Sequence, residues 1–323
     1  MSFRDSSKPR KEFGIMAKGD FNIYQKVTDR IIEQLEKGVI PWRKPWKVSG
    51  VQIRFKEDLS KLAFNRVTKL AYGALNQMLL SQVGEYASFK QWTDLGGKIK
   101  KGAKSEIVVF WKWLDYKDEN NVDENGNPKI KRVPYLKHYQ VFHISDVEGV
   151  EPLKLDELNE GEEKPEPDCF DSIEEAERII NEYQTRESMP VEYRGNEAYY
   201  APALDRVTLP ERFKFGKNTA EFYSTAFHEL GHSTGAKHRL DRQIRNHFGD
   251  TAYSKEELVA EICASGMLNL LNIETPDSFT NSVAYIQSWI SQLKKDNKLI
   301  VMASAQAEKA IKYILNGKES EAA

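Results

Sequence analysis

Few folds accommodate the pentapeptide His228-Glu229-Leu230-Gly231-His232. Two histidines four residues apart project from the same face of an α-helix, so both imidazoles can reach one metal ion. The glutamate beside the first histidine can take a proton from a metal-bound water. The pattern therefore predicts a helix that carries two metal ligands and a catalytic Glu229. A catalytic zinc site also needs a third protein ligand from elsewhere in the chain.

Two segments compete to supply that third ligand. His238 completes the spacing typical of metzincins through Gly235, but no methionine turn follows it. Glu257 and Glu261 lie four apart on the next predicted helix. That spacing is typical of gluzincins, in which one carboxylate binds zinc and the other hydrogen-bonds a ligand histidine. We favour Glu257 as the ligand and Glu261 as its support, with Glu261 or His238 as alternative ligands. A helix-capping role for Glu257, paired with Ser254, is the non-functional interpretation.

The donor set also limits the metal. Two histidine nitrogens and a carboxylate suit Zn²⁺ in a site with an open position for water. The same donors accept Mn²⁺ or another divalent ion, so zinc is the favoured metal and not the sole candidate.

Charge divides the chain into two parts. Residues 1–150 contain 27 Lys/Arg and 18 Asp/Glu, whereas the remainder contains 20 and 31. A basic first half and an acidic second half predict two domains with different partners, and nucleic acid suits the basic one. Residues 151–171 hold nine acidic residues and three prolines, a composition typical of a solvated linker. The predicted division is a disordered basic tail over 1–19, domains over 20–150 and 172–323, and this linker between them.

Hydrophobic spacing predicts an α+β fold for both domains. In the first, helices are expected from Asp20 to Gly38, over 73–83, and from a capping box at Ser88. Strands over 106–114 and 130–144 then form a hairpin. In the second domain, a helix is expected from Ser172, followed by a small sheet. A hairpin is expected around Gly195, and Asp205 is expected to lie just before a strand at the edge of the sheet. The rest of the second domain is predicted to be mainly helical.

The expected cellular location of the protein follows from three features that its sequence lacks. No stretch approaches the roughly 18 consecutive apolar residues of a membrane helix, and the first residues have no apolar signal-peptide core. Cys169 and Cys263 cannot form a disulfide framework or a four-cysteine zinc site. A cytoplasmic protein without a membrane partner is expected.

Aromatic and basic residues gather in the first domain. It contains five of the six tryptophans, at 42, 46, 92, 111 and 113. Unpaired bases stack on aromatic faces while lysine and arginine follow the phosphates. At least two tryptophans are expected in the core, but Trp42, between two prolines, is expected at the surface. The candidate DNA-binding residues are Trp42, Arg43, Lys44, Trp46, Lys98, Lys100, Lys101 and Lys104.

Several motifs in order resemble the ArdC-type antirestriction proteins of conjugative plasmids. They include IYQKVTDRIIEQLEKGVIPWRKPW, ASFKQWTDLGGKIKKGAK and VVFWKW in the first half, and YYAPALDRVTLP, FHELGHSTG and YSKEELVAEI in the second. The resemblance implies an N-terminal single-stranded-DNA-binding domain, shared with TraC-type primases, and a C-terminal zincin-like domain. It also implies protection of incoming DNA from host restriction endonucleases. The zincin-like part is similar to proteases that clear protein crosslinked to DNA.

Three functional hypotheses follow. The first is an antirestriction protein that binds single-stranded DNA and hydrolyses peptide bonds at a zinc site, its protein substrate being a restriction enzyme or another DNA-bound protein. The second is a non-enzymatic protein that coats single strands and has a structural or latent metal site. The third is a primase accessory module, which ranks low because no polymerase-like carboxylate cluster is present.

Overall fold

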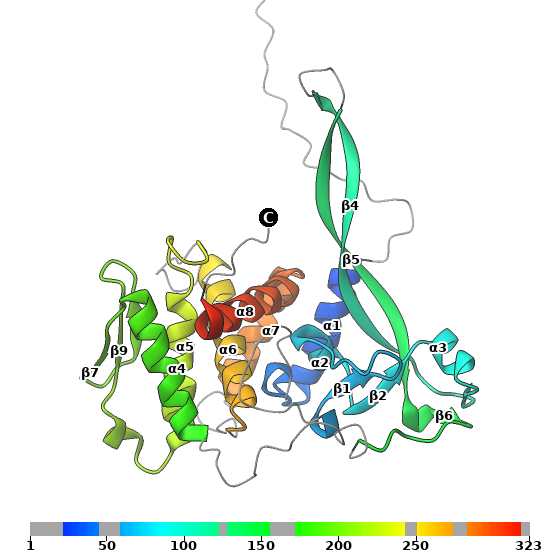
Figure 1. Ribbon diagram of the computed structural model, residues 1–323, viewed down its shortest axis with the longest axis horizontal. Coiled ribbons are helices and arrows are strands. Elements are labelled where there is room, and N and C mark those ends of the chain that lie inside the picture. Colours follow the sequence, from blue (N-terminus) through cyan, green and yellow to red (C-terminus); the bar gives the residue numbers. More distant parts are fainter. Residues whose placement is uncertain are drawn as a thin grey trace, which may run out of the picture.

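The computed structural model describes residues 22–44, 59–122, 128–155, 172–242, 251–273 and 283–317. The fold is α+β, and Figure 1 shows a helical region beside a smaller unit from which a long hairpin projects. The predicted tail over 1–19 and most of the predicted linker lie outside the described residues.

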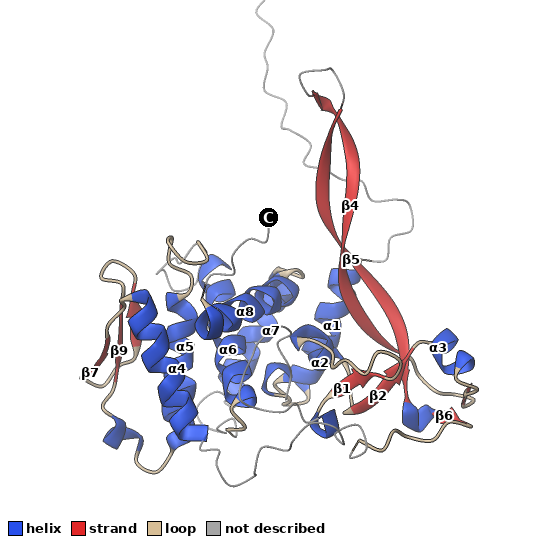
Figure 2. Ribbon diagram, in the orientation of Figure 1, coloured by secondary structure: helices blue, strands red, loops and turns tan. Residues whose placement is uncertain are grey.

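The N-terminal unit is a curled mixed sheet with helices against it (Figure 2). The sheet order is β1-β2-β5-β4, with β1 and β2 parallel and the other pairs antiparallel. Its strands are β1 Ala63–Asn65, β2 Gly84–Ala87, β4 Glu106–Val122 and β5 Pro128–His143. A two-stranded sheet joins β3 Lys98–Ile99 to β6 Val147–Glu148. The helices are α1 Ile23–Glu36, α2 Ala74–Leu79 and α3 Phe89–Asp94, with 3₁₀ turns η1 Pro41–Arg43, η2 Leu59–Lys61 and η3 Ile144–Asp146.

Local sequence explains several of these elements. The side chain of Asn22 accepts the Gln25 N–H at the start of α1, and the apolar face of α1 is buried as its spacing predicts. The predicted capping box at Ser88 is confirmed, with both reciprocal bonds to Gln91 present. The predicted hairpin is also confirmed, although β4 continues to Val122, well past the expected end at residue 114.

The C-terminal unit packs helices on a three-stranded sheet. Its helices are α4 Ser172–Glu187, α5 Thr219–Ser233, α6 Thr251–Leu270, α7 Val283–Lys295 and α8 Leu299–Asn316, with a 3₁₀ turn η5 at Arg212–Phe215. Its strands are β7 Val191–Tyr193, β8 Tyr199–Ala201 and β9 Arg206–Leu209, in the order β7-β9-β8. No helix among the described residues is both long and apolar enough to cross a membrane.

Two expectations for this small sheet are wrong. The segment around Gly195 does not join a hairpin, because β7 and β8 both pair with β9, one parallel and one antiparallel. The hairpin turn lies instead between β8 and β9, where Asp205 has a φ of 43°. The strand after Asp205 is therefore the central one and not an edge. Alternation alone cannot reveal this order, because an edge strand and a central strand can share one sequence pattern.

One hydrophobic core joins the two units. It contains α1, η1 and α2 residues together with residues of α5 to α8. The ring of Trp42 is completely buried and meets Trp289 of α7 edge-on, with ring centroids 6.0 Å apart. Thr28 Oγ1 of α1 donates to the Asn297 carbonyl at 2.8 Å. Helix α1 is thus packed against α7 and α8.

Candidate metal centre

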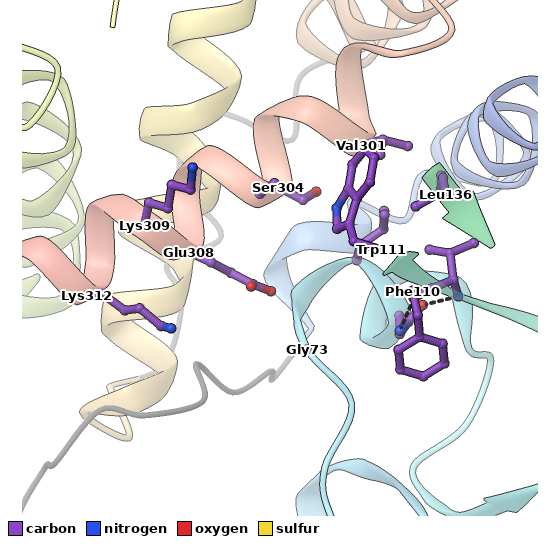
Figure 3. A pocket seen from close by; sticks show the side chains of 13 residues that line it. Gly73, Phe110, Trp111, Leu136, Val301, Ser304, Glu308, Lys309 and Lys312 are labelled. Atoms are coloured by element: carbon purple, nitrogen blue, oxygen red, sulfur yellow. Dashed lines mark hydrogen bonds between the residues drawn. The ribbon is translucent and has the colours of Figure 1, made fainter. Parts of the chain in front are cut away.

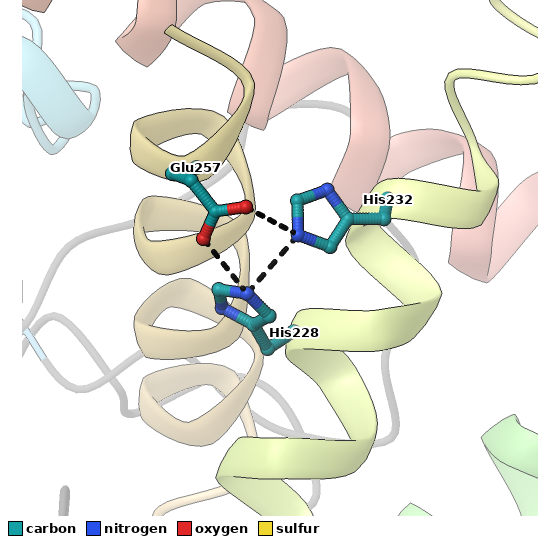
Figure 4. Close-up of side chains that lie close together, drawn as sticks. All are labelled: His228, His232 and Glu257. Atoms are coloured by element: carbon teal, nitrogen blue, oxygen red, sulfur yellow. Dashed lines mark hydrogen bonds and ion pairs between the residues drawn. The ribbon is translucent and has the colours of Figure 1, made fainter. Parts of the chain in front are cut away.

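Helix α5 positions both histidines of the pentapeptide. The side chain of Asn218 accepts the Glu221 N–H at 3.1 Å and caps the start of the helix. Tyr223, Phe227 and Leu230 are buried on one side of α5. The histidines project from another side of the helix toward α6, as Figure 4 shows.

Glu257 of α6 supplies the third donor. Its Oε2 lies 3.6 Å from His228 Nε2, and its Oε1 lies 3.4 Å from His232 Nε2. The two Nε2 atoms are 3.1 Å apart (Figure 4). Among the described residues, these three side chains lie close enough together to hold one metal ion. The helix-capping interpretation of Glu257 does not hold, because α6 already begins at Thr251.

The separations fit one tetrahedral metal ion. Bonds of about 2.1 Å to nitrogen or oxygen place neighbouring ligand atoms about 3.4 Å apart in a tetrahedron. The two histidine Nε2 atoms are 3.1 Å apart, and each lies 3.4 or 3.6 Å from a different oxygen of Glu257, all near that value. The donors therefore need little rearrangement to bind a divalent metal.

The pKa shifts of the three donor residues also favour a bound cation. Burial opposes a charge on His232, but the carboxylates of Glu256 and Glu257 outweigh it and raise its pKa to about 10. Burial also opposes a charge on His228, but its hydrogen bond to the Glu257 carboxylate and nearby negative charges outweigh burial and raise its pKa. Burial opposes the charge on Glu257 too, but the two histidines hold its pKa well below the usual range. The site stabilises positive charge between these side chains, which a divalent metal supplies.

Close helix packing brings the donors together. Gly231 lies between the two histidines in sequence, and a Cβ atom placed on it would lie 3.3 Å from Ala260 Cα and 3.4 Å from Cys263 Cβ. Only a residue without a side chain allows α5 to approach α6 this closely without displacing a neighbour. The fully buried Cys263 has its pKa raised to about 12 by burial, so its thiol is a packing group.

Glu229 is placed for acid–base chemistry beside the donors. Only 7% of the residue is exposed. Its negative charge is among the influences that raise the pKa values of His228 and His232. A carboxylate in this position can accept a proton from a water held at the site.

Glu256 supports the site and was not predicted. Its Oε1 lies 3.4 Å from Nδ1 of His232, the nitrogen that faces away from Glu257. Arg242 donates to both Glu256 oxygens, at 2.8 and 3.0 Å, and to the Gly231 carbonyl at 2.7 Å. The Nδ1 atom of His232 has no hydrogen bond of normal geometry, so Glu256 supports this ring as a nearby negative charge that helps to raise its pKa. The sequence signal that could have indicated this role is that Glu256 is adjacent to Glu257.

The alternative ligands have other contacts. His238 is 59% exposed in its side chain, and its Nε2 lies 3.3 Å from Asp205 Oδ2. Glu261 lies close enough to His228 for its charge to help raise the pKa of that imidazole, and together with burial it raises the pKa of Tyr285. Glu256 acts on the other histidine, because it faces Nδ1 of His232 across the α5–α6 contact.

Asp205 of the β8–β9 turn has a buried arginine as its partner. Arg239, whose side chain is fully buried, donates to both Asp205 oxygens at 2.7 and 2.9 Å and to the Ser233 carbonyl at 3.0 Å. This ion pair ties the β8–β9 turn to the end of α5. It supports the helix that carries the histidines.

The proposed DNA-binding residues near η1 are mostly integrated in the fold. The expectation of an exposed Trp42 is wrong, because apolar side chains of both units surround its ring. Lys44 Nζ donates to Gln34 Oε1 at 2.7 Å, and burial together with nearby Arg30 lowers its pKa. Arg43 is half-buried. Trp46 lies outside the described residues.

A second group of proposed DNA-binding residues is exposed. Lys98, Lys100, Lys101 and Lys104 lie in and after β3, around a turn at Gly102 that has a φ of +90°. Lys100 Nζ donates to the Ser145 carbonyl at 2.8 Å. The two proposed groups approach each other at Lys104, which lines one cavity with Arg30 and Glu106, and the charges of Arg30 and Glu106 act on Lys44.

Comparison with known proteins agrees with this arrangement. Residues 21–142 match the N-terminal domain of anti-restriction factor ArdC, and residues 174–306 match a zincin-like metallopeptidase. A protein of Sinorhizobium fredii (strain NBRC 101917 / NGR234), the uncharacterized protein y4eC, is 30% identical over 93% of this chain and 94% of its own length. This chain belongs to the ArdC-type antirestriction family.

Solved ArdC structures share the fold. The metal-free crystal structure of antirestriction ArdC protein from R388 plasmid matches with a TM-score of 0.63 and 28% identity, over 92% of this chain and 98% of that one. Its Mn(II)-bound structure matches with the same TM-score at 27% identity, over 93% and 100% of the two chains. The DNA primase TraC of Escherichia coli is 31% identical over 96% of this chain, which spans only 20% of that primase.

Proposed function

We propose that this protein protects incoming DNA from restriction by binding single strands through its N-terminal unit and hydrolysing peptide bonds at a zinc site in its C-terminal unit. The observation that carries the peptidase assignment is the convergence of His228, His232 and Glu257 beside the buried Glu229. The ArdC-type pair of domains supports the link to DNA. The proposed place of action is the cytoplasm.

The chain's own residues have distinct tasks in this proposal. A divalent metal at the site supplies a Lewis acid that polarises a carbonyl and acidifies water. His228, His232 and Glu257 hold the ion, and Glu256 supports the ring of His232 from its Nδ1 side. Glu229 accepts a proton from the attacking water and delivers it to the leaving amine nitrogen. Zinc is the proposed metal, and the Mn(II)-bound ArdC structure supports manganese as a substitute.

Single-strand binding is proposed for the basic surface of the N-terminal unit. The exposed lysines at 98, 100, 101 and 104 supply phosphate contacts, with Arg43 and Trp46 as further candidates. Such contacts release counterions, so affinity should fall steeply as salt rises from about 50 to about 200 mM. Binding that is unchanged over this range would exclude a phosphate-tracking mode.

Cleavage assays test the peptidase assignment. Metal-loaded wild type is compared with Glu229→Gln and Glu257→Gln, with and without single-stranded DNA, for self-cleavage and for cleavage of a DNA-bound protein. We expect cleavage by wild type alone, with metal retained by Glu229→Gln and lost from Glu257→Gln. Equal cleavage by Glu229→Gln would remove the proposed base from the mechanism.

Antirestriction separates this proposal from a non-enzymatic coating function. If protection depends on proteolysis, Glu229→Gln should lose it while still binding single strands. Full protection by that variant, with no cleavage by wild type under any condition, would assign protection to coating and leave the metal a structural role.

A further inference from the structure

We propose that one face of the β4–β5 hairpin is a stacking platform for the unpaired bases of single-stranded DNA. The platform consists of Phe110, Tyr135 and Tyr139, with Lys112 and Lys137 among them. The inference rests on the proposed single-strand binding and adds a surface that is separate from the lysines at 98–104. None of the five residues belongs to the metal centre or to the basic turn after β3.

Strand register places the five side chains on one face. Val108 pairs with Tyr139, Phe110 with Lys137, and Lys112 with Tyr135. Directly opposed residues in an antiparallel ladder share a face, and so do residues two apart along one strand. Aromatic rings and ammonium groups therefore alternate on this face, both along each strand and between the paired strands.

The aromatic side chains of the platform are exposed. Phe110 and Tyr135 are each 45% exposed and Tyr139 is 38% exposed. The Phe110 and Tyr139 rings meet at an angle of 67° with centroids 5.8 Å apart, and Phe110 also lies 6.4 Å from the buried Tyr72. These contacts hold the rings in place while leaving part of each in solvent. Preordered rings lose little entropy when a base stacks on them.

The opposite face of β4 faces α8, and Trp111 on it stays 39% exposed. Figure 3 shows Trp111 pointing toward Val301 and Ser304 of α8, while Phe110 points to the other side of the strand. Leu136, which pairs with Trp111, is only 3% exposed. The two faces of this segment therefore differ: the platform face carries three exposed aromatic rings with lysines between them, whereas the opposite face meets α8 and carries one partly exposed ring, that of Trp111.

Charge selects the class of ligand. Lys137 Nζ lies 5.0 Å from the centroid of the Tyr139 ring, and Lys112 is exposed. A purely apolar partner would leave these ammonium groups without counter-charges, whereas a phosphate backbone supplies one charge for each nucleotide. Double-stranded DNA keeps its base faces stacked inside the duplex, so only unpaired bases can use the rings.

The test compares two strands that differ only in their bases. Binding of an oligo-dT and of an abasic strand of equal length is measured by fluorescence anisotropy at low salt. Wild type should prefer oligo-dT. Phe110→Ala combined with Tyr139→Ala should lower oligo-dT affinity at least about fivefold for each ring, and leave the abasic strand nearly unaffected.

Matched variants separate stacking from other effects. Phe213→Ala removes an aromatic ring that is 74% exposed and has Lys214 Nζ 5.8 Å away, but lies in the C-terminal unit, and it should keep the full preference for bases. Phe110→Tyr should keep the wild-type affinity for oligo-dT. Phe110→Leu should lose affinity, because an aliphatic side chain offers no π-face. Thermal melts establish that each variant is folded.

Two other results would overturn the inference. If wild type prefers oligo-dT and the double alanine variant keeps that preference, the platform is wrong while the proposed DNA binding stands. If wild type binds neither strand, both proposals fail. A platform variant that changes the sedimentation coefficient but not DNA affinity would assign this face to contact between two copies of the chain, which also contradicts the inference.

Discussion

His232 has carboxylates beside both of its ring nitrogens. Glu257 lies at Nε2 and Glu256 at Nδ1. Arg242 in turn holds Glu256 through two hydrogen bonds. These negative charges raise the basicity of the ring, which strengthens a metal bond at Nε2.

Replacing Glu256 should therefore weaken metal binding without removing a ligand. We expect Glu256→Gln to lower metal affinity by roughly 10–100-fold, because the neutral amide no longer raises the basicity of the ring. Competition with a chelating indicator measures the affinity. His238→Ala should bind metal like wild type, since that imidazole lies at Asp205. Unchanged affinity in Glu256→Gln would contradict the supporting role, and loss in His238→Ala would revive the alternative ligand.

The metal centre depends on two helices that are in close contact at Gly231. Two donors come from α5 and one from α6, and the contact that sets their separation is at Gly231. Helix axes with ordinary side chains between them lie about 8–10 Å apart, so a residue without Cβ permits closer packing.

A larger residue at this contact should separate the donors. Gly231→Val is expected to destabilise the protein by about 1–3 kcal/mol through overpacking. It should also lower metal affinity, because α5 moves away from α6. Ala220→Val, at a half-exposed position on the same helix, serves as the control for a β-branched residue. Thermal melts with and without metal measure both effects. A Gly231→Val protein with wild-type metal affinity would show that the contact does not set the site.

Packing between the two units extends across the protein. Trp42 joins η1 to α7, and Thr28 joins α1 to the loop before α8. Glu308 of α8 accepts the Ala74 N–H at the start of α2, at 2.9 Å. The units therefore contribute to each other's stability.

Removing the buried indole should destabilise both units together. Trp42→Ala is expected to cost about 3–5 kcal/mol of unfolding free energy, through lost burial and the cavity left behind. Denaturant unfolding followed by circular dichroism and by loss of metal should give coincident transitions at lower denaturant. Two well-separated transitions would show that the units fold independently.

The buried carboxylate at the same boundary should make stability depend on pH. Burial raises the pKa of Glu308 above its usual range, against the opposing Ala74 hydrogen bond and Lys312. A raised folded-state pKa contributes stability that is present below the unfolded pKa of about 4.3 and is lost as pH rises through the folded pKa. Glu308→Gln keeps the acceptor and cannot ionise. Its melting temperature should equal that of wild type near pH 4 and exceed it at pH 7, and a difference that does not grow with pH would contradict this account.

Local pattern was sufficient for much of the architecture. Side-chain caps and apolar spacing predicted α1 and α3 close to their observed starts, because these signals act within one or two turns. The pairing of the small C-terminal sheet was not predictable in this way. The order of its strands depends on how they pack with α4 and α5, which is a contact between distant segments of the chain.

The sequence by itself determined that His228, Glu229 and His232 share one helix, since a spacing of four fixes their relative positions in any α-helix. It also narrowed the third ligand to a few residues, with Glu257 favoured. Only the tertiary structure decided that Glu257 meets the histidines, that Glu256 supports them, and that Trp42 lies in the core. The physical reason is that a helix sets the direction of its own side chains, whereas contacts between distant segments depend on how closely their helices and strands pack.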